Sequence, residues 1–282
     1  KIIWDWDDVT GANGYQWNTS NTYPGAGNNT VSTSTYTQLG LSCGKNYSIY
    51  IWAYNNNCHS NPVLLTNSTT QCFDCGTATV TFNYNGTGSP TVTYGTVTGQ
   101  NGTCWLDRNL GALQVATASD DANAYGDYFQ WGRLDDGHQI YNTTTTTTTS
   151  SSDTPGHSLW IAHLEGTYDW REPKNDNLWQ SGSNINNPCP NGWRVPTYDE
   201  FNTERLSWSS NNATGAFNST LKLTVAGNRT CYGWMDGSVG VYGKYWASTV
   251  YNNNSHFITF GTSALIGHAY RGYGFSVRCI KD

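Results

Sequence analysis

The segment from Asn187 to Phe201 places a cysteine, a strand-type Trp-Arg-Val run and the start of a helix close together. Thr197 and Glu200 predict a capping box, because the Thr hydroxyl can accept from an amide of the first helical turn while the Glu carboxylate reaches back to the Thr197 N–H. Pro196 removes a backbone N–H where strand pairing has to stop. The segment therefore predicts a strand-to-helix junction, with the helix running to about Trp208.

The pattern Gly192-Trp-Arg-Val-Pro-Thr-Tyr-Asp-Glu-Phe201 resembles a segment of the Fibrobacter succinogenes major paralogous domain family, a set of secreted bacterial modules. Three further stretches agree with that family: Cys104–Ala112, Ala124–Arg133 and Gly274–Asp282. The resemblance covers roughly residues 75–282. It implies an α+β, C-type-lectin-like fold with about two helices and a place outside the cell, and it implies no settled activity.

The same fold is distantly similar to that of formylglycine-generating enzymes. Their redox cysteines would lie shortly before the final strand, but no cysteine lies between Cys231 and Cys279. That activity is therefore not expected.

Residues 1–72 alternate between strand-type runs and turn clusters, without helical periodicity. The run from Leu41 through Gly44 and Tyr47 to Asn55 resembles the sixth strand of a fibronectin type III sandwich. This resemblance implies that Tyr47 is a corner tyrosine and that Trp6 is the core indole of the second strand. We therefore expect a mainly β chain with two domains, a fibronectin type III-like β-sandwich at 1–72 and a C-type-lectin-like domain at 73–282.

A fibronectin type III module has a strand before the one that carries Trp6, and only five residues precede Trp6. An unfilled groove would leave backbone groups unpaired, at about 1–3 kcal/mol for each buried group. A strand from another copy would fill it by β-augmentation, and such a heterologous contact propagates into a fibre unless it closes into a ring. Alternatively, the sequence begins downstream of its true start, or the domain tolerates an open edge.

In the second domain, Thr77–Tyr84 and Thr91–Tyr94 predict a β-hairpin. Helical spacing of Ala124, Tyr128 and Trp131 predicts a first helix over 120–131. The Thr- and Ser-rich run 143–152 is expected to be a mobile surface loop. Four further strands are expected, at Leu221–Val225, Lys244–Thr249, His256–Phe260 and Gly274–Ile280.

Charged residues make up only 12% of the chain and the net charge is −6. No basic surface is therefore expected to neutralise phosphates, and nucleic acid is not an expected partner. No run of 18 apolar residues predicts a membrane span, and no signal peptide is present. The sequence is typical of a mature, exported chain.

The eight cysteines have no metal-binding spacing and indicate disulfides in an oxidising compartment, although 105 pairings are formally open. A hairpin centred near residue 57 places Cys43 opposite Cys72. Cys189 and Cys279 would join the ends of the second domain's core. Elimination leaves the pairs Cys75–Cys104 and Cys58–Cys231, and Cys58 could instead join neighbouring copies.

Sequons for N-glycosylation are only slightly more numerous than chance predicts in a chain so rich in Asn, Ser and Thr, so they indicate compatibility with glycans and little more. They are Asn18, Asn28, Asn46, Asn67, Asn85, Asn101, Asn142, Asn212, Asn218, Asn228 and Asn253. Thr143, Thr145 and Thr147 are candidates for O-glycosylation, and an undecorated spacer is the alternative.

No constellation for catalysis is apparent. The histidines His138, His157, His163 and His256 have no activated nucleophile in their sequence context. Glu200 and Glu204 are one helical turn apart, which favours capping and a solvated face over a catalytic pair.

Two weak binding signals remain. Asp135 and Asp136 offer hard carboxylate ligands for calcium in a turn, although two acids beside a glycine are common in loops. Trp160 and Trp179 could stack on sugar rings if exposed.

The sequence therefore predicts a non-enzymatic secreted structural protein, the subunit of an extracellular filament or bacterial surface matrix that assembles head to tail by strand complementation. The alternative is a cell-surface adhesin or carbohydrate-binding module. The expected partners are other copies of the chain and glycans, attached or bound. No cofactor is expected, calcium excepted.

Overall fold

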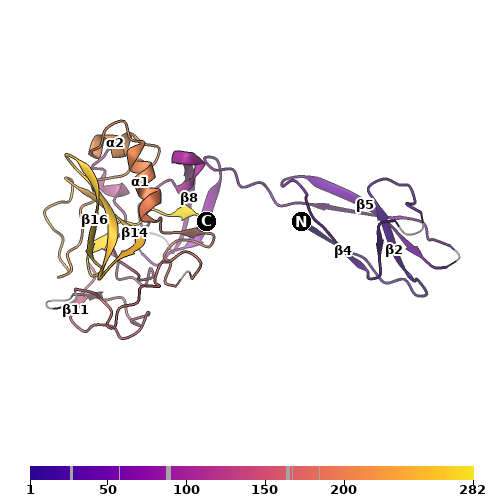
Figure 1. The fold of residues 1–282 in the computed structure, drawn as a ribbon, viewed down its shortest axis with the longest axis horizontal. Helices are drawn as coiled ribbons and strands as arrows, with labels where there is room; N and C mark the ends of the chain where they lie inside the picture. Colours follow the sequence, from indigo (N-terminus) through magenta and orange to yellow (C-terminus); the bar gives the residue numbers. More distant parts are fainter. Residues whose placement is uncertain (26–27, 57, 87–89, 163–165, 167, 184) are drawn as a thin grey trace. The chain divides into compact units, whose positions relative to one another are not determined.

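The computed structural model describes residues 1–25, 28–56, 58–86, 90–162, 166, 168–183 and 185–282. The chain divides into two compact units, unit 1 (Lys1–Phe73) and unit 2 (Asp74–Asp282), one residue beyond the expected boundary. It is mainly β, with two α-helices among the described residues, both in unit 2 (Figure 1). The expectation of a mainly β chain is therefore confirmed.

Unit 1 contains two antiparallel sheets. One pairs β1 (Ile2–Asp5) with β4 (Thr35–Gln38). The other has the order β3-β2-β5-β6, formed by β3 (Thr30–Val31), β2 (Gly14–Asn18), β5 (Asn46–Tyr54) and β6 (Val63–Ser68). Their inner faces share a core of Ile2, Trp4, Tyr15, Ile49, Ile51 and Ala53. The alternation of β-branched and aromatic residues with polar ones predicted strands at β1, β2 and β5, and the hairpin centred near residue 57 predicted β6. Strands β3 and β4 were not predicted.

The core indole of unit 1 is Trp4, and the prediction that it would be Trp6 is wrong. Both side chains have the parity of the inward face, but Trp6 lies just beyond the end of β1 and is only partly buried. The Tyr47 hydroxyl accepts a hydrogen bond from the Ser42 N–H at 2.9 Å, which is the contact expected of a corner tyrosine.

The largest sheet of unit 2 has the order β13-β18-β9-β8-β7. Its strands are β13 (Trp193–Arg194), β18 (Ile280–Lys281), β9 (Cys104–Leu106), β8 (Thr91–Thr98) and β7 (Thr79–Asn83). The hairpin of β7 and β8 was predicted. The final strand, β18, lies between β13 and β9, so it joins segments far apart in the sequence.

A second antiparallel sheet is formed by β14 (Gly243–Tyr251), β15 (Asn254–Phe260) and β16 (Ala264–Tyr270). Two short pairs complete the unit: β10 (Phe129–Gln130) with β17 (Gly274–Phe275), and β11 (Thr145–Thr146) with β12 (Trp160–Ile161). The run 143–152 lies at the surface, as expected, and is held at β11 by parallel pairing with β12.

Helix α1 (Tyr198–Leu206) begins at the predicted capping box. The Thr197 hydroxyl accepts from the Glu200 N–H at 3.3 Å, and the Glu200 carboxylate accepts from the Thr197 N–H at 2.7 Å. The helix contacts β14, β15 and β16 (Figure 1). Helix α2 (Ala213–Asn218) was not predicted; its N-cap, Asn212, accepts from the Gly215 N–H.

The predicted helix over 120–131 is wrong. This segment contains a 3₁₀ turn at Ala122–Ala124 and then β10. Gly126 has a φ of +71°, and a Cβ there would come within 2.3 Å of the Leu110 carbonyl oxygen. The chain therefore leaves helical geometry at Gly126, where only glycine fits.

Two strand predictions also need correction. Leu221–Val225 is buried apart from the exposed Lys222, but it is no strand, since Lys222 has a φ of +47°, which breaks an extended run. The expected strand Gly274–Ile280 is two strands, β17 and β18, in different sheets. A second 3₁₀ turn spans Gln100–Gly102.

Three of the four expected disulfides are present: Cys43–Cys72, Cys75–Cys104 and Cys189–Cys279. The fourth, Cys58–Cys231, is not formed. The Cys231 side chain is buried beside Tyr273 in unit 2, whereas Cys58 is exposed in unit 1. Disulfides of this kind indicate an oxidising compartment. Among the described residues, none of the helices is long and apolar enough to cross a membrane.

Candidate functional site

Among the described residues of unit 1, the outer strands of the two sheets, β1, β4, β3 and β6, each leave one edge without a strand partner. Among its described residues, β1 pairs only with β4, and β6 pairs only with β5. Beside these edges lies a cavity of about 400 Å³, which we call the open groove. A strand edge carries a row of backbone N–H and C=O groups that can template another strand.

The open groove has two walls and a floor. The wall that follows β1 consists of Asp5, Trp6, Asp7 and Val9; the floor of Tyr15, Ile51 and Ala53; the wall that leads into β6 of Ser60, Val63 and Leu65. The floor belongs to the core of unit 1, so the groove reaches the hydrophobic interior. Apolar side chains inserted here would be removed from water, at about 25 cal/mol for each Å² buried.

Apolar side chains on both walls of the groove are exposed to solvent in the described part of unit 1. Val63 is 56% exposed and Val9 is 49% exposed, although both are apolar. The indole N–H of Trp6 is buried, and it has no hydrogen-bond acceptor among the described residues. The Trp6 ring packs edge-on against Tyr15 at 5.3 Å between ring centroids. An inserted strand would cover the valines and offer backbone carbonyls to the indole.

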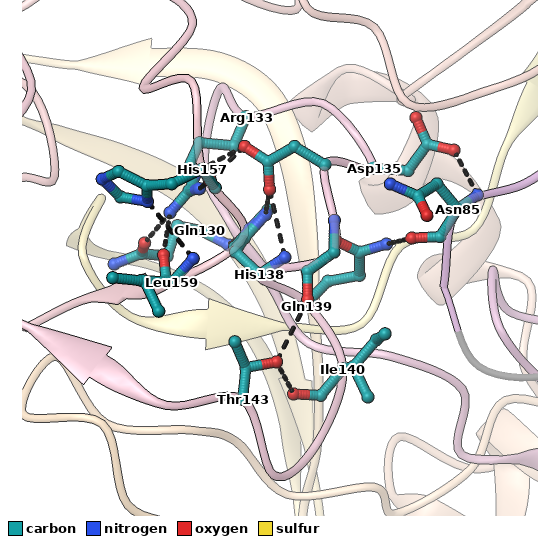
Figure 2. Close-up of polar contacts among 12 residues, drawn as sticks. Asn85, Gln130, Arg133, Asp135, His138, Gln139, Ile140, Thr143, His157 and Leu159 are labelled. Carbon is teal, nitrogen blue, oxygen red and sulfur yellow. Dashed lines mark hydrogen bonds and ion pairs between the residues drawn. The ribbon is translucent and has the colours of Figure 1, made fainter.

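A second cluster surrounds His138 in unit 2 (Figure 2). The His138 Nδ1–H donates to Asp136 at 2.6 Å, and His138 Nε2 accepts from the Gln130 N–H at 3.0 Å. Arg133 donates to the same Asp136 carboxylate at 2.7 Å. Burial lowers the pKa of His138 to about 3, and the Arg133 charge adds to this effect. His138 is therefore neutral at pH 7, and the contact with Asp136 is a hydrogen bond rather than an ion pair.

The carboxylates of Asp135 and Asp136 are engaged by different partners within the protein. Burial alone would raise the pKa of Asp136, but His138 and Arg133 outweigh burial and lower this pKa to about 2. Asp135 points elsewhere and accepts from the Asn85 N–H at 2.9 Å (Figure 2). No group of three or more His, Cys, Asp or Glu side chains suited to a metal occurs among the described residues. The sequence-based calcium site at Asp135 and Asp136 is therefore not supported.

The remaining catalytic candidates do not converge. Glu200 caps α1 and pairs with Arg194 at 2.6 Å. Glu204 is buried and accepts from the Gln100 N–H at 2.7 Å, so its expected solvated position is wrong. His157 accepts from the Leu159 N–H, His256 contacts Tyr198 and Tyr251, and His163 lies outside the described residues.

The indoles proposed for sugar stacking are inaccessible, because Trp160 is 0% and Trp179 1% exposed. The exposed indole is Trp234, at 60%. It stacks on Tyr232 at 5.1 Å, and Tyr232 lies edge-on to Tyr168, which in turn packs against Tyr270 at 4.9 Å. We call Tyr168, Tyr232, Trp234 and Tyr270 the aromatic patch. Sequence spacing gave no signal for it, since exposure depends on the fold.

Exposure divides the glycosylation candidates. Asn228 is fully buried, where its side-chain oxygen accepts from Lys244, so it is excluded as a glycosylation site. Asn18 and Asn212 are half-buried, and both are used in local hydrogen bonds. The Thr143 hydroxyl donates inward to Gly137 and Ile140. The exposed candidates are Asn28, Asn46, Asn67, Asn85, Asn101, Asn142, Asn218, Asn253, Thr145 and Thr147.

No family model, curated protein or solved structure matches this chain. The function must therefore be argued from the geometry of its own sites. The open groove combines apolar walls with strand edges that have no partner among the described residues.

Proposed function

We propose that this chain is a non-enzymatic secreted structural protein whose unit 1 is completed by a β-strand from another copy, so that copies assemble head to tail into an extracellular filament or matrix on a bacterial surface. The open groove carries this proposal. Its floor is the core of unit 1 and both flanking strand edges lack a partner among the described residues. An added strand would form hydrogen bonds with the unpaired backbone N–H and C=O groups of these edges and would also bury the apolar walls.

In this proposal unit 1 is a fibronectin type III-like sandwich with an open groove, and unit 2 is a C-type-lectin-like domain of the major paralogous type. Two observations support the first assignment: the pair of packed antiparallel sheets and the Tyr47–Ser42 contact. The capping box of α1 and the Cys189–Cys279 disulfide support the second. The three disulfides favour a place outside the cell.

The test is electron microscopy and native mass spectrometry of the full chain, with paired variants of β6. Val63 lines the open groove and is 56% exposed, whereas its neighbour Leu64 is 51% exposed and does not line it. Val63→Asp should abolish polymers, because a carboxylate would have to be buried beneath the incoming strand. Leu64→Asp should leave them intact. Dispersed monomers of the unaltered chain, or equal effects of both variants, would contradict the proposal.

The aromatic patch favours a second candidate function, carbohydrate binding by unit 2. An exposed ring face presents an apolar surface to the C–H groups of a sugar, and the tyrosine hydroxyls supply hydrogen bonds at its rim. A glycan array with Trp234→Ala tests this function, with Tyr141→Ala as control because Tyr141 is equally exposed outside the patch. Sugar binding that both variants retain would rule out the patch as the site.

A further inference from the structure

A lysine, an asparagine and an aspartate of unit 2 meet in the segment that leads into β14. The Lys244 ammonium donates to the side-chain oxygen of Asn228 at 2.5 Å and lies 3.5 Å from the Asp236 carboxylate. Lys244 and Asn228 are 16 positions apart in the sequence, and Asp236 lies between them. A short stretch of chain therefore brings an amine, a carboxamide and a carboxylate into contact.

The carboxamide of Asn228 has donors on its oxygen but no partner on its nitrogen. The residue is fully buried, and its side-chain nitrogen has no hydrogen-bond partner among the described residues. Buried amide nitrogens normally have an acceptor. The side-chain oxygen accepts from Lys244 and lies 3.3 Å from the Ser238 hydroxyl, which also contacts the Asp236 carboxylate. This arrangement suits an amide that is attacked at carbon and then loses its nitrogen.

The backbone holds the reacting groups in place. The Gly227 N–H donates to the Tyr242 carbonyl at 2.7 Å, and the Asp236 N–H donates to the Asn228 carbonyl at 3.2 Å. Because the side-chain oxygen of Asn228 is bonded to Cγ at about 1.2 Å, the Lys244 Nζ lies within about 3.7 Å of that carbon. Reacting atoms held this close react far faster than the same groups free in solution.

We propose that Lys244 and Asn228 form a covalent isopeptide cross-link within unit 2, with Asp236 as the proton carrier. The Lys244 ammonium first transfers a proton to the Asp236 carboxylate. The neutral Nζ then attacks Asn228 Cγ, and the carbonyl oxygen takes up negative charge beside the Ser238 hydroxyl.

The second half of the reaction releases ammonia. Asp236 passes its proton to the Asn228 side-chain nitrogen and accepts one from Nζ. The carbonyl re-forms, the bond from Cγ to the side-chain nitrogen breaks, and ammonia leaves with the proton that Asp236 holds. A primary amide and an ammonium group thus become a secondary amide and an ammonium ion, so the step needs no oxidant, reductant or other reactant.

The surroundings of the three side chains fit this reaction. The ring of Phe275, which is 2% exposed, lies on the inner side with its centroid 5.9 Å from the Lys244 Nζ. The Lys244 and Asp236 side chains are 23% and 30% exposed, which leaves ammonia a path to solvent. The cross-link also removes the buried amide nitrogen that has no partner in the described structure.

The test is mass spectrometry of the full chain, produced without glycans and fully reduced. The cross-link removes one ammonia, so the unaltered chain should be lighter than its sequence by about 17 Da. An acylated Lys244 resists trypsin, so a digest should contain residues 223–229 joined to residues 230–271. The joined peptide is decisive, because succinimide formation at an Asn-Gly step also releases ammonia.

Matched variants assign the bond to these side chains. Lys244→Arg keeps the positive charge but has no amine to acylate, so it should retain the ammonia. Lys222→Arg changes an exposed lysine of the same segment, and its chain should still contain the joined peptide. Asp236→Asn removes the proton carrier and should slow cross-linking by about a hundredfold or more. Near-ultraviolet circular dichroism checks that each variant is folded.

The outcomes are independent of polymer formation, so they separate this inference from the proposed function. If the folded, unaltered chain keeps its ammonia and trypsin cleaves it after Lys244, the contact is a hydrogen bond only and the inference is overturned. A joined peptide that persists in Lys244→Arg overturns it as well. If Asp236→Asn cross-links as fast as the unaltered chain, the proton-transfer step is wrong.

Discussion

Asp169 is a buried carboxylate next to the aromatic patch, and it predicts an unusual pH dependence of stability. Its side chain is almost completely enclosed, with 2% of the residue exposed. Burial raises the pKa of Asp169 to about 6, although the nearby Arg271 charge and the hydrogen bond from the Arg171 N–H oppose this. The carboxyl group is therefore easier to protonate in the folded chain than in the unfolded chain.

The magnitude follows from the shift. The pKa moves from 3.8 to about 6, which is about two units, and each unit corresponds to about 1.4 kcal/mol. A raised carboxyl pKa stabilises the fold fully at pH values below the unfolded pKa, and this contribution is lost as the pH rises through the folded pKa. Asp169 should therefore lower the free energy of unfolding by about 3 kcal/mol between about pH 4 and pH 7.

The assay compares the unaltered chain with Asp169→Asn, which keeps the shape and an accepting oxygen but cannot ionise. Urea unfolding is followed by tryptophan fluorescence from pH 4 to pH 7. Because other titrating groups are common to both chains, the difference between the two free energies isolates Asp169. As the pH rises from 4 to 7, the free energy of unfolding of Asp169→Asn should increase by about 3 kcal/mol relative to that of the unaltered chain. A difference that is flat with pH, or one that favours the unaltered chain as the pH rises, would refute the reasoning.

Three further sets of substitutions test interactions that stabilise unit 2. Thr197→Ala should cost about 1 kcal/mol in urea unfolding by removing the cap of α1, and a mid-helix Thr203→Ala that costs as much would refute the capping role. Replacing Cys189 and Cys279 by Ala opens a loop with a sequence separation of 90 and should lower stability by about 4 to 5 kcal/mol in the chain-entropy model; an unchanged melting temperature would contradict this. Arg278→Ala removes a fully buried guanidinium that donates to Asn109 and the Leu221 carbonyl, and should cost about 3 to 5 kcal/mol by calorimetry; a loss below about 1 kcal/mol would show that water replaces it.

Local signals in the sequence were read correctly where the deciding contacts are close along the chain. The capping box at Thr197 and Glu200 and the hairpin of β7 and β8 depend on neighbouring residues. The pair Cys43–Cys72 follows from the antiparallel pairing of β5 with β6. The helix expected over 120–131 failed because apolar spacing does not reveal that Gly126 adopts a positive φ against Leu110.

Most long-range contacts were not predictable in this way, the Cys189–Cys279 disulfide being an exception. The β6 wall of the open groove, with Val63 and Leu65, is placed by pairing with β5, which strand counting along the sequence does not reveal. Composition could not distinguish the buried Trp160 from the exposed Trp234. The pair Cys58–Cys231 was reached by elimination, which assumes that every cysteine is bonded.

The position of β18 sets an order of events during synthesis. Ile280 pairs with both Arg194 in β13 and Trp105 in β9, so it joins β13 to the rest of the five-stranded sheet. Until the ribosome has added Ile280, β13 has no neighbour in that sheet and the strands from β7 to β9 end in an open edge. Cys279, the neighbouring residue, arrives at the same time and only then can bond to Cys189. Unit 2 therefore cannot complete its five-stranded sheet until residues near position 280 have been added, and its earlier strands stay incompletely paired until then.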